Sequence, residues 1–351
     1  MFKFQYLRFV LVAFLAVSFL ACKRNKDAQP KGKYENGLLI INEGNFSASN
    51  GEVSFLKKAD NSLTNNIFEI ENGRPLACII QDAEVYNNRI YLVGNRADKV
   101  EIVEAGSFKS VGSITTNLVN PISFAAVGNK GYIMNWGPFD NNFNNPNPFV
   151  LVFDLTNFNV LKTIPLSARP QGCIAYNNKV YIALAASNKI AILNPSTDTI
   201  EGDIIVANSP NQLVIDKNNK IWAICSSGAL VRFNPANNGV EATITGVQTS
   251  GFSEKFAINP AKDELYWLAA EPFPSRLVRA YKMSITATSA PSSPIVTRNN
   301  LYGIGVSADN KLLLGDSKAF QGAGALLRFD LNGNLIDEFT TGIAPSQFLN
   351  R

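Results

Sequence analysis

Histidine is absent from the 351 residues of this chain. Histidine is the usual general base of hydrolase triads and a common ligand of catalytic zinc and iron. Its absence excludes Ser-His-Asp triads, Cys-His pairs and metal sites that need an imidazole. The sequence also lacks a dinucleotide-binding glycine motif, a phosphate-binding loop and a nucleophile elbow. We therefore expect a protein that is not an enzyme and has no cofactor and no metal.

Cysteine is scarce, with four residues in the chain. Cys78, Cys173 and Cys225 each lie in an apolar, strand-like stretch, and their spacing does not resemble that of a metal site. We expect these three to be buried free thiols. The fourth, Cys22, stands in a different context.

The first residues have the layout of a cleaved export signal, with Lys3 and Arg8 before an apolar run at residues 9–20. That run is too short to span a bilayer. A small residue directly before Cys22 is typical of a lipoprotein cleavage site. The sequence thus predicts a lipoprotein signal peptide over 1–21, a lipidated Cys22 with a flexible tether over 22–36, and a folded domain over 37–351. Ordinary cleavage nearby is the alternative.

Excess charge is also missing. Without residues 1–21 the formal net charge falls from +4 to +2, and no polybasic patch remains. This argues against a nucleic-acid partner, and we expect membrane contact through the lipid anchor only. Hydrophobic residues, at 46%, are sufficient for a packed core.

A short polar turn followed by an apolar strand recurs seven times along the chain. The copies begin 52, 41, 49, 41, 44 and 47 residues apart, which is the size of a four-stranded propeller blade. Alternating apolar and polar residues elsewhere in each repeat have the period of a β-strand. We call these turn-and-strand segments the anchors: residues 36–39, 88–91, 129–132, 178–181, 219–222, 263–266 and 310–313.

The repeat predicts an all-β fold, a seven-bladed β-propeller of four-stranded blades. A proline turn often precedes the innermost strand of a blade, and the last such turn, at Pro345, has no blade of its own to complete. We therefore expect residues 346–350 to form the innermost strand of the first blade, beside residues 38–41. Closure of this kind pairs both chain ends and removes exposed sheet edges.

A ligand site is expected on one face of the propeller. Strands alternate in direction, so the loops before the innermost strands and after the second strands emerge together around the central channel. Their side chains are rich in amides and aromatic rings, which suits a large neutral ligand with amide or hydroxyl groups. The candidate ligand-binding residues are Asn42, Glu43, Asn45, Phe46, Asp82, Asn95, Arg96, Asn135, Trp136, Phe139, Gln171, Asn211, Gln212, Tyr302, Phe320 and Gln347.

Two alternatives remain open for this face. Asn, Gly and Pro are also common in tight turns for backbone reasons alone. The longest irregular insertion, residues 138–148, contains five asparagines and two phenylalanines. It is either an adjustable flap over the site or a disordered linker.

Several of these segments resemble a known family. The run Ile40-Ile41-Asn42-Glu43-Gly44-Asn45-Phe46, the segment Asn135-Trp136-Gly137, and proline turns followed by strands such as Asn178-Lys179-Val180-Tyr181 resemble the YncE-like (YVTN-repeat) propellers of Bacteroidetes surface lipoproteins. The resemblance covers residues 37–351. BtuG-type members of that group capture cobalamin and pass it to a TonB-dependent outer-membrane transporter.

The resemblance implies a surface-exposed outer-membrane lipoprotein that captures a bulky nutrient, with a corrinoid as the best single candidate, and feeds a TonB-dependent transporter. A protein-interaction scaffold at the cell envelope is the second hypothesis, since propellers serve both purposes. A lyase or dehydrogenase of propeller type is a third, which the lack of histidine disfavours.

Overall fold

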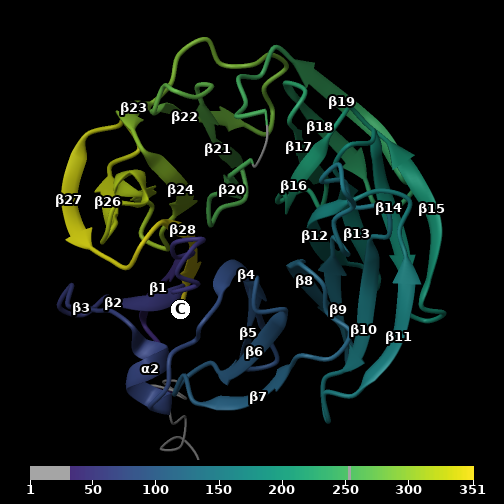
Figure 1. The fold of residues 1–351 in the computed structure, drawn as a ribbon. Helices are drawn as coiled ribbons and strands as arrows, with labels where there is room; N and C mark the ends of the chain where they lie inside the picture. The colour runs from purple at the N-terminus through teal and green to yellow at the C-terminus, as the bar shows by residue number, and fades with distance from the viewer. Residues whose placement is uncertain (1–31, 252–253) are drawn as a thin grey trace, which may run out of the picture.

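The computed structural model describes residues 32–251 and 254–351, and these form seven four-stranded antiparallel sheets arranged as blades in a ring (Figure 1). The predicted all-β propeller is confirmed. The expected signal peptide, Cys22 and most of the tether lie outside the described residues. Within them, no helix is long and apolar enough to cross a membrane.

Each blade runs from an innermost strand at the channel to an outer strand at the rim. Blade 1 contains β28 (Pro345–Asn350), β1 (Gly37–Asn42), β2 (Glu52–Lys57) and β3 (Leu63–Thr64). Blades 2 and 3 contain β4 (Ile79–Tyr86), β5 (Arg89–Asn95), β6 (Lys99–Glu104) and β7 (Ser110–Ile114), then β8 (Pro121–Val127), β9 (Lys130–Asn135), β10 (Phe149–Asp154) and β11 (Val160–Pro165).

The remaining four blades follow in chain order around the ring. Blades 4 and 5 contain β12 (Pro170–Tyr176), β13 (Lys179–Leu184), β14 (Lys189–Asn194) and β15 (Thr199–Ile205), then β16 (Pro210–Ile215), β17 (Ile221–Cys225), β18 (Ala229–Asn234) and β19 (Gly239–Thr245). Blades 6 and 7 contain β20 (Phe256–Ile258), β21 (Glu264–Ala270), β22 (Leu277–Ser284) and β23 (Val296–Asn299), then β24 (Leu301–Val306), β25 (Leu312–Asp316), β26 (Ala325–Phe329) and β27 (Leu335–Thr340).

The last strand closes the ring as the sequence predicts. β28 is the innermost strand of blade 1 and pairs antiparallel with β1, with Leu39 opposite Leu349 and Ile40 opposite Phe348. The innermost edge of blade 1 is therefore paired by the other end of the chain, which removes the open edge that β1 would otherwise present.

The core lies between the blades, with one cluster of buried apolar side chains at each of the seven interfaces of the described ring. Successive residues of a strand point to opposite faces, so each second strand contributes to the clusters on both its sides. In every repeat the last anchor residue is fully buried and faces the following blade. These residues are Leu39, Tyr91, Tyr132, Tyr181, Trp222, Tyr266 and Leu313.

Two short helical segments interrupt the strands. α2 (Ile67–Asn72) follows the two-residue strand β3 and buries Ile67 and Phe68 against the outer part of blade 1. Gly73 ends it in the left-handed conformation, with φ 66°. The 3-10 segment η1 (Lys318–Phe320) lies after β25. The sequence did not predict α2, because one helical turn and a half carries little periodic signal.

The three described cysteines are free. Cys78 and Cys225 are buried, as expected, and Cys173 is half-buried on the innermost strand of blade 4. Burial raises the pKa of the Cys78 and Cys225 thiols to about 12. The prediction of buried free thiols is thus confirmed for two of the three, and none has the lowered pKa of a reactive cysteine.

Candidate ligand site at the mouth of the channel

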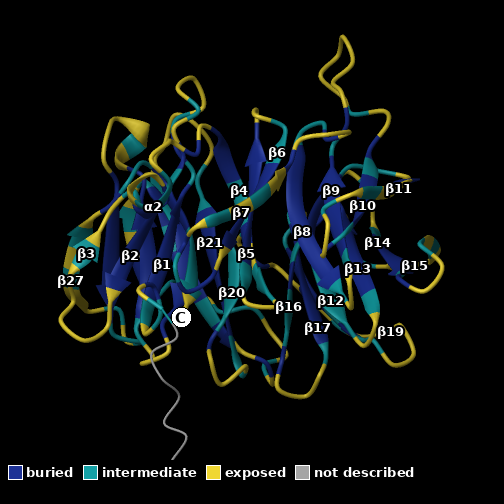
Figure 2. Ribbon diagram, turned by 90° about the horizontal axis from the view of Figure 1, so that it is seen from below, coloured by how far each residue is buried: buried dark blue, intermediate teal, exposed yellow. Residues whose placement is uncertain are grey.

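The starts of the innermost strands and the ends of the second strands meet on one face of the ring. Antiparallel pairing places Ile79 opposite Asn95 in blade 2 and Pro121 opposite Asn135 in blade 3. We call this face the mouth. β1 runs towards it and β28 away from it. In Figure 2 the C terminus lies towards the lower side of the strands, and the tallest exposed loops rise from the upper side.

A hollow of about 240 Å³ opens at the mouth. Five of the seven blades contribute to it, so its shape depends on the whole ring rather than on one loop. We call it the mouth hollow; its lining residues are Glu43, Phe46, Ile79, Gln81, Asn95, Trp136, Arg169, Gln171 and Tyr302. Six of the sixteen candidate residues named from the sequence are among them.

Glu43 holds two other lining residues in place. Gln81 donates to one carboxylate oxygen over 2.9 Å, and the Tyr302 hydroxyl donates to the other over 2.7 Å. Burial and the Glu43 carboxylate raise the pKa of Tyr302 well above its ordinary value, so the phenol remains a donor. The amide and the ring are therefore fixed before any ligand arrives, which lowers the ordering cost of binding.

On the opposite wall, Arg169 lies over the ring of Trp136, with 5.0 Å between the guanidinium carbon and the ring centroid. The Trp136 indole N–H donates to the Pro170 carbonyl over 2.8 Å, which fixes the ring. Two polar atoms of this wall are buried without a hydrogen-bond partner: Nε of Arg169 and Oε1 of Gln171. Such atoms cost free energy in the empty protein, and a ligand that supplied their partners would recover it.

Aromatic rings surround the mouth hollow. Phe46 is 66% exposed and lies under Arg96, with the guanidinium carbon 4.2 Å from the ring centroid. Phe139 packs edge-on against Trp136, and Phe320 packs edge-on against Tyr302. The apolar surface of the site therefore continues beyond the hollow onto the surrounding loops, where a ligand larger than the hollow would rest.

A second hollow of about 100 Å³ lies next along the channel and shares Gln81 with the first. Of the residues named from the sequence, Asp82, Gln212 and Gln347 line it. Asp82 accepts the Phe124 backbone N–H over 3.0 Å and a longer bond from the Gln347 amide. Burial raises the pKa of Asp82, while these donors and Lys255 oppose the rise.

Three candidate asparagines line neither hollow, and their contact with ligand stays a prediction. Asn42 and Asn135 are fully buried at the ends of second strands, where they bond Ser54 and the Ile133 carbonyl respectively. Asn211 is also buried and accepts the Glu254 backbone N–H. The hydrogen bonds of these three buried side chains stabilise the loops at the mouth.

The other four candidates lie outside the hollows. Arg96, Phe139 and Phe320 surround the mouth hollow through the ring contacts above, and Asn45 is exposed, with its amide 3.4 Å from the Phe320 carbonyl. Sequence reasoning left out two lining cations, Arg169 and Lys255. Arg169 directly precedes a proline turn that the repeat had identified, so its position was available as a signal.

The insertion at residues 138–148 forms a hydrogen-bonded turn. The Asp140 carboxylate accepts the backbone N–H groups of Asn142 and Asn144, each over 2.8 Å. Phe143, at its tip, is 83% exposed. The loop thus places an aromatic side chain in solvent beside the mouth, and its role as a flap stays a prediction.

A third hollow, of about 210 Å³, lies further along the innermost strands and contains Glu84, Phe124 and Cys173. Enclosure by protein and the charge of Asp82 raise the pKa of Glu84 to about 8. Because this pKa exceeds the ordinary 4.5, the folded protein holds the proton more tightly than the unfolded chain does. The resulting stability is complete below about pH 4.5 and is lost as the pH rises through about 8.

We therefore expect Glu84→Gln to flatten the pH dependence of stability. Between about pH 5 and about pH 8.5 the native protein should lose more thermal stability than the variant, whose amide cannot ionise. The difference will be modest, since the Glu84 side chain still reaches solvent. Thermal unfolding followed by circular dichroism at both pH values measures it, and parallel pH profiles for the two proteins would contradict the assignment.

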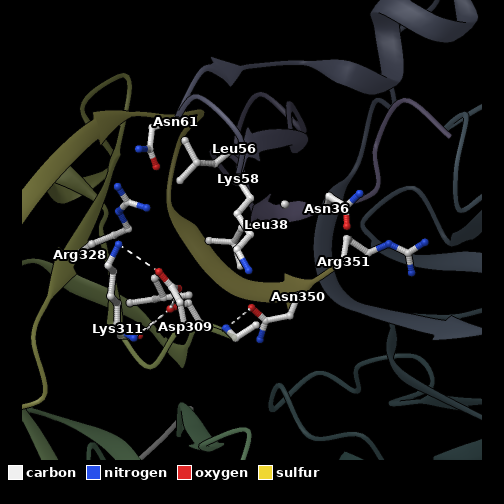
Figure 3. Close-up of a pocket in the computed structure, with 14 residues that line it drawn as sticks. Asn36, Leu38, Leu56, Lys58, Asn61, Asp309, Lys311, Arg328, Asn350 and Arg351 are labelled. Atoms are coloured by element: carbon white, nitrogen blue, oxygen red, sulfur yellow. Dashed lines mark hydrogen bonds and ion pairs between the residues drawn. The ribbon is translucent and has the colours of Figure 1, made fainter. Parts of the chain in front are cut away.

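On the face opposite the mouth, a hollow of about 250 Å³ lies between blades 1 and 7 (Figure 3). Three of its four cations have carboxylate partners: Lys311 lies 3.0 Å from Asp309, Arg351 lies 3.8 Å from Glu35, and Arg328 forms a two-point pair with Asp337 at 2.7 and 2.5 Å. The fourth, Lys58, has no carboxylate within 4.0 Å among the described residues. Most of the positive charge of this hollow is therefore compensated, although Nε of Arg351 is buried without a hydrogen-bond partner. Arg169, in the mouth hollow, has no carboxylate within 4.0 Å among the described residues.

Among the described residues no three Cys, Asp or Glu side chains converge as a metal site would require. The ring of seven blades and the hollow at its mouth define a β-propeller with a preformed concavity over its channel. The chain belongs to the family described as a domain of unknown function, DUF5074, whose profile matches residues 36–340. No curated protein matches the sequence.

Solved structures similar to this chain share its fold at low sequence identity. A quinonprotein alcohol dehydrogenase-like protein from Bacteroides thetaiotaomicron has a TM-score of 0.67 and 12% identity, over 90% of this chain and 78% of that one. Kuenenia stuttgartiensis hydrazine synthase has a TM-score of 0.56 and 14% identity, over 74% of this chain and 85% of that one. The dihydro-heme d1 dehydrogenase NirN has a TM-score of 0.57 and 10% identity, over 91% of this chain and 76% of that one. At these identities the likeness concerns the fold alone.

Proposed function

We propose that this propeller is a non-enzymatic binding protein that captures a small molecule at the mouth of its channel. The observation that carries the proposal is the mouth hollow itself, where Trp136 and Tyr302 are held rigidly beside the unpartnered Oε1 of Gln171. A concave site that combines aromatic surface with a few fixed polar groups is the usual form of a ligand site.

The arrangement of the carboxylates supports binding rather than turnover. Both oxygens of Glu43 accept hydrogen bonds from protein donors, and Asp82 accepts from a backbone N–H and an amide. Each of these hydrogen bonds stabilises the ionised carboxylate and so weakens it as a general base. These two side chains instead act as supports for the lining of the hollows.

The size of the mouth hollow bears on the ligand. A pocket that encloses a drug-sized molecule usually measures about 300–1,000 Å³, so a hollow of about 240 Å³ takes only part of a bulky ligand. The exposed rings of Phe46, Phe139 and Phe320 provide a surface on which the rest would lie. A corrinoid fits the proposal in this mode, resting across the mouth with one side group inserted.

The wider setting is part of the same proposal. A lipid on Cys22 would hold the propeller at the outer membrane, displayed at the cell surface. The described chain enters blade 1 on the face opposite the mouth, so an anchor there would leave the mouth turned away from it. A TonB-dependent transporter would then receive the ligand.

Thermal unfolding of the purified protein against cobalamins, oligosaccharides and siderophores tests the proposal. A ligand at a hundred times its Kd adds about 2.7 kcal/mol to stability, which raises the Tm by several degrees in a domain of this size. We expect one compound class to produce such a shift. Trp136→Ala should abolish it, and Leu161→Ala, an exposed side chain on the outer strand β11, should leave it unchanged.

A scaffold for another protein is the second candidate, and two exposed rings favour it. Phe273 is 94% exposed and Phe143 is 83% exposed, both in loops that follow second strands. Exposed aromatic side chains are enriched at protein interfaces. If no compound shifts the Tm while native membranes yield one stoichiometric partner that Phe273→Ala loses, the scaffold function replaces small-molecule capture.

A further inference from the structure

Arg169 is a cation without an anion. Its guanidinium lies over Trp136, and no described carboxylate comes within 4.0 Å of it. The side chain is half-buried, its Nε has no hydrogen-bond partner, and burial lowers its pKa because nothing nearby compensates the charge. Desolvating a charged donor without an acceptor is costly.

The acidic groups around the two hollows are in the opposite condition. Glu43 accepts from Gln81 and Tyr302, and Glu254 accepts the backbone N–H groups of Ser250 and Gly251. Their negative charges are satisfied by protein donors, as is that of Asp82.

Among the described residues, the cations of the mouth contact aromatic rings and form no side-chain hydrogen bond to an oxygen acceptor. Arg169 lies over Trp136, Arg96 over Phe46 and Lys255 over Tyr302. A ring face attracts a cation but accepts none of its N–H bonds in the plane. The N–H donors of these cations therefore lack a negatively charged acceptor in the described part of the chain.

From this asymmetry we infer that the captured ligand carries a carboxylate, which Arg169 binds in the mouth hollow. The inference rests on the proposed function and specifies the chemical class of its ligand. A planar carboxylate takes two parallel N–H bonds from a guanidinium. It also brings one negative charge, whereas a phosphate would bring up to two into a hollow that already contains Glu43.

The second unpartnered atom adds a constraint. Oε1 of Gln171 is an acceptor, more than nine-tenths of the Gln171 side chain is buried, and both it and Arg169 line the same hollow. A ligand that satisfies both therefore presents a carboxylate together with a nearby N–H or O–H donor, on an apolar body that contacts Trp136. This specification includes acidic derivatives of larger molecules and excludes ligands that are wholly neutral.

Matched small probes can test the carboxylate separately from the whole ligand. Benzoate and benzamide have nearly the same shape and differ in charge, and phenyl phosphate tests the other oxyanion. Of the three tryptophans, Trp222 and Trp267 are fully buried, so changes in emission on titration report on Trp136. In low-salt buffer free of phosphate and carboxylates, benzoate should bind at least about tenfold more tightly than benzamide.

The variant Arg169→Met keeps an unbranched, flexible side chain that can pack on Trp136 but removes the charge and the N–H donors. It should reduce benzoate binding to the level of benzamide and leave benzamide unchanged, while Arg169→Lys retains part of the preference. The Tm of Arg169→Met should equal or exceed that of the native protein, because an unpartnered donor is removed. A fall in Tm would assign Arg169 a structural role instead.

The outcomes separate this inference from the proposed function. Equal binding of benzoate and benzamide would overturn the inference that the ligand carries a carboxylate, and it would not contradict small-molecule capture. Tighter binding of phenyl phosphate than of benzoate would overturn the choice of anion. No response of Trp136 to any probe would overturn the inference, and capture itself would then fail only if the panel of larger ligands also produced no shift in Tm.

Discussion

Replacing β28 with a six-residue Gly-Ser linker is expected to abolish the cooperative unfolding transition of the whole ring. β28 supplies the innermost strand of blade 1, and two of its side chains belong to different interface clusters, Leu349 between blades 1 and 2 and Phe348 between blades 7 and 1. Its loss would open both interfaces and expose the edge of β1. Since a domain of ordinary stability has only about 5–15 kcal/mol to lose, we expect a loosely packed or aggregating product.

A linker of the same length in place of β27 is the matched control. β27 is also a six-residue strand, but it lies at the outer edge of blade 7 and its side chains are mostly exposed. This variant should still unfold cooperatively, with a lower Tm. Circular dichroism during heating and the binding of a hydrophobic dye distinguish the two outcomes. If the β28 variant unfolds cooperatively within a few degrees of the β27 variant, ring closure is not what stabilises this propeller.

The repeat predicts so much of the fold because one residue has the same task in every blade. The last anchor residue faces the following blade in all seven repeats, as Tyr91 and Tyr132 do. A position with a constant environment leaves a constant pattern in the sequence, and its spacing then gives the number and size of the blades. Proline turns likewise recur before innermost strands, so the turn at Pro345, which has no blade of its own, predicted that the last strand completes blade 1.

The site was only partly predictable, and the asparagines explain why. Asn42, Asn95 and Asn135 occupy the same place in the repeat, at the end of a second strand. Asn95 lines the mouth hollow, whereas the other two are fully buried. The pairing of the innermost strand with the second strand shifts register next to this position in all three blades, so the strict alternation of side chains ends there. Sequence periodicity cannot specify the direction of a side chain beyond that point.

The cations of the mouth were overlooked for a different reason. Arg169 and Lys255 are single charged residues in a chain with a modest net charge. Whether such a residue can bind an anion depends on whether a carboxylate of the protein already pairs with it. Only the structure shows that Arg169 has an aromatic neighbour and, among the described residues, no carboxylate within 4.0 Å. Composition suggested an amide-rich site for a neutral ligand, whereas the carboxylate that we infer rests on the surroundings of Arg169.

Gly315→Ala is expected to be the most damaging single substitution considered, because the closing strand begins against blade 7 where glycines leave room for it. A Cβ atom on Gly315 would collide with the backbone carbonyl oxygen of Pro345. On Gly303 it would lie 2.5 Å from the same oxygen, and on Gly324 2.5 Å from the Pro345 ring. Backbone atoms cannot rotate away as side chains do, so β28 would have to move.

The substitution should cost about 1–3 kcal/mol or more, which corresponds to a fall in Tm of several degrees. Gly202→Ala is the matched control, since Gly202 also lies within a strand, β15, and a Cβ there would meet nothing within 4 Å. That variant should be as stable as the native protein or slightly more stable. Equal Tm values for the two variants would show that the start of β28 can shift freely.

The same substitution links the closure of the ring to its site. Ser346 and Gln347 directly follow Pro345 and line the second hollow. The Gln347 side chain also forms hydrogen bonds with the Asp82 carboxylate and the Ala83 backbone. Moving β28 would displace these contacts, so Gly315→Ala should weaken ligand binding even in the fraction of protein that remains folded. Gly202→Ala, on the outer strand of blade 4, should bind as the native protein does, and titration of both variants at a temperature well below their Tm measures the difference.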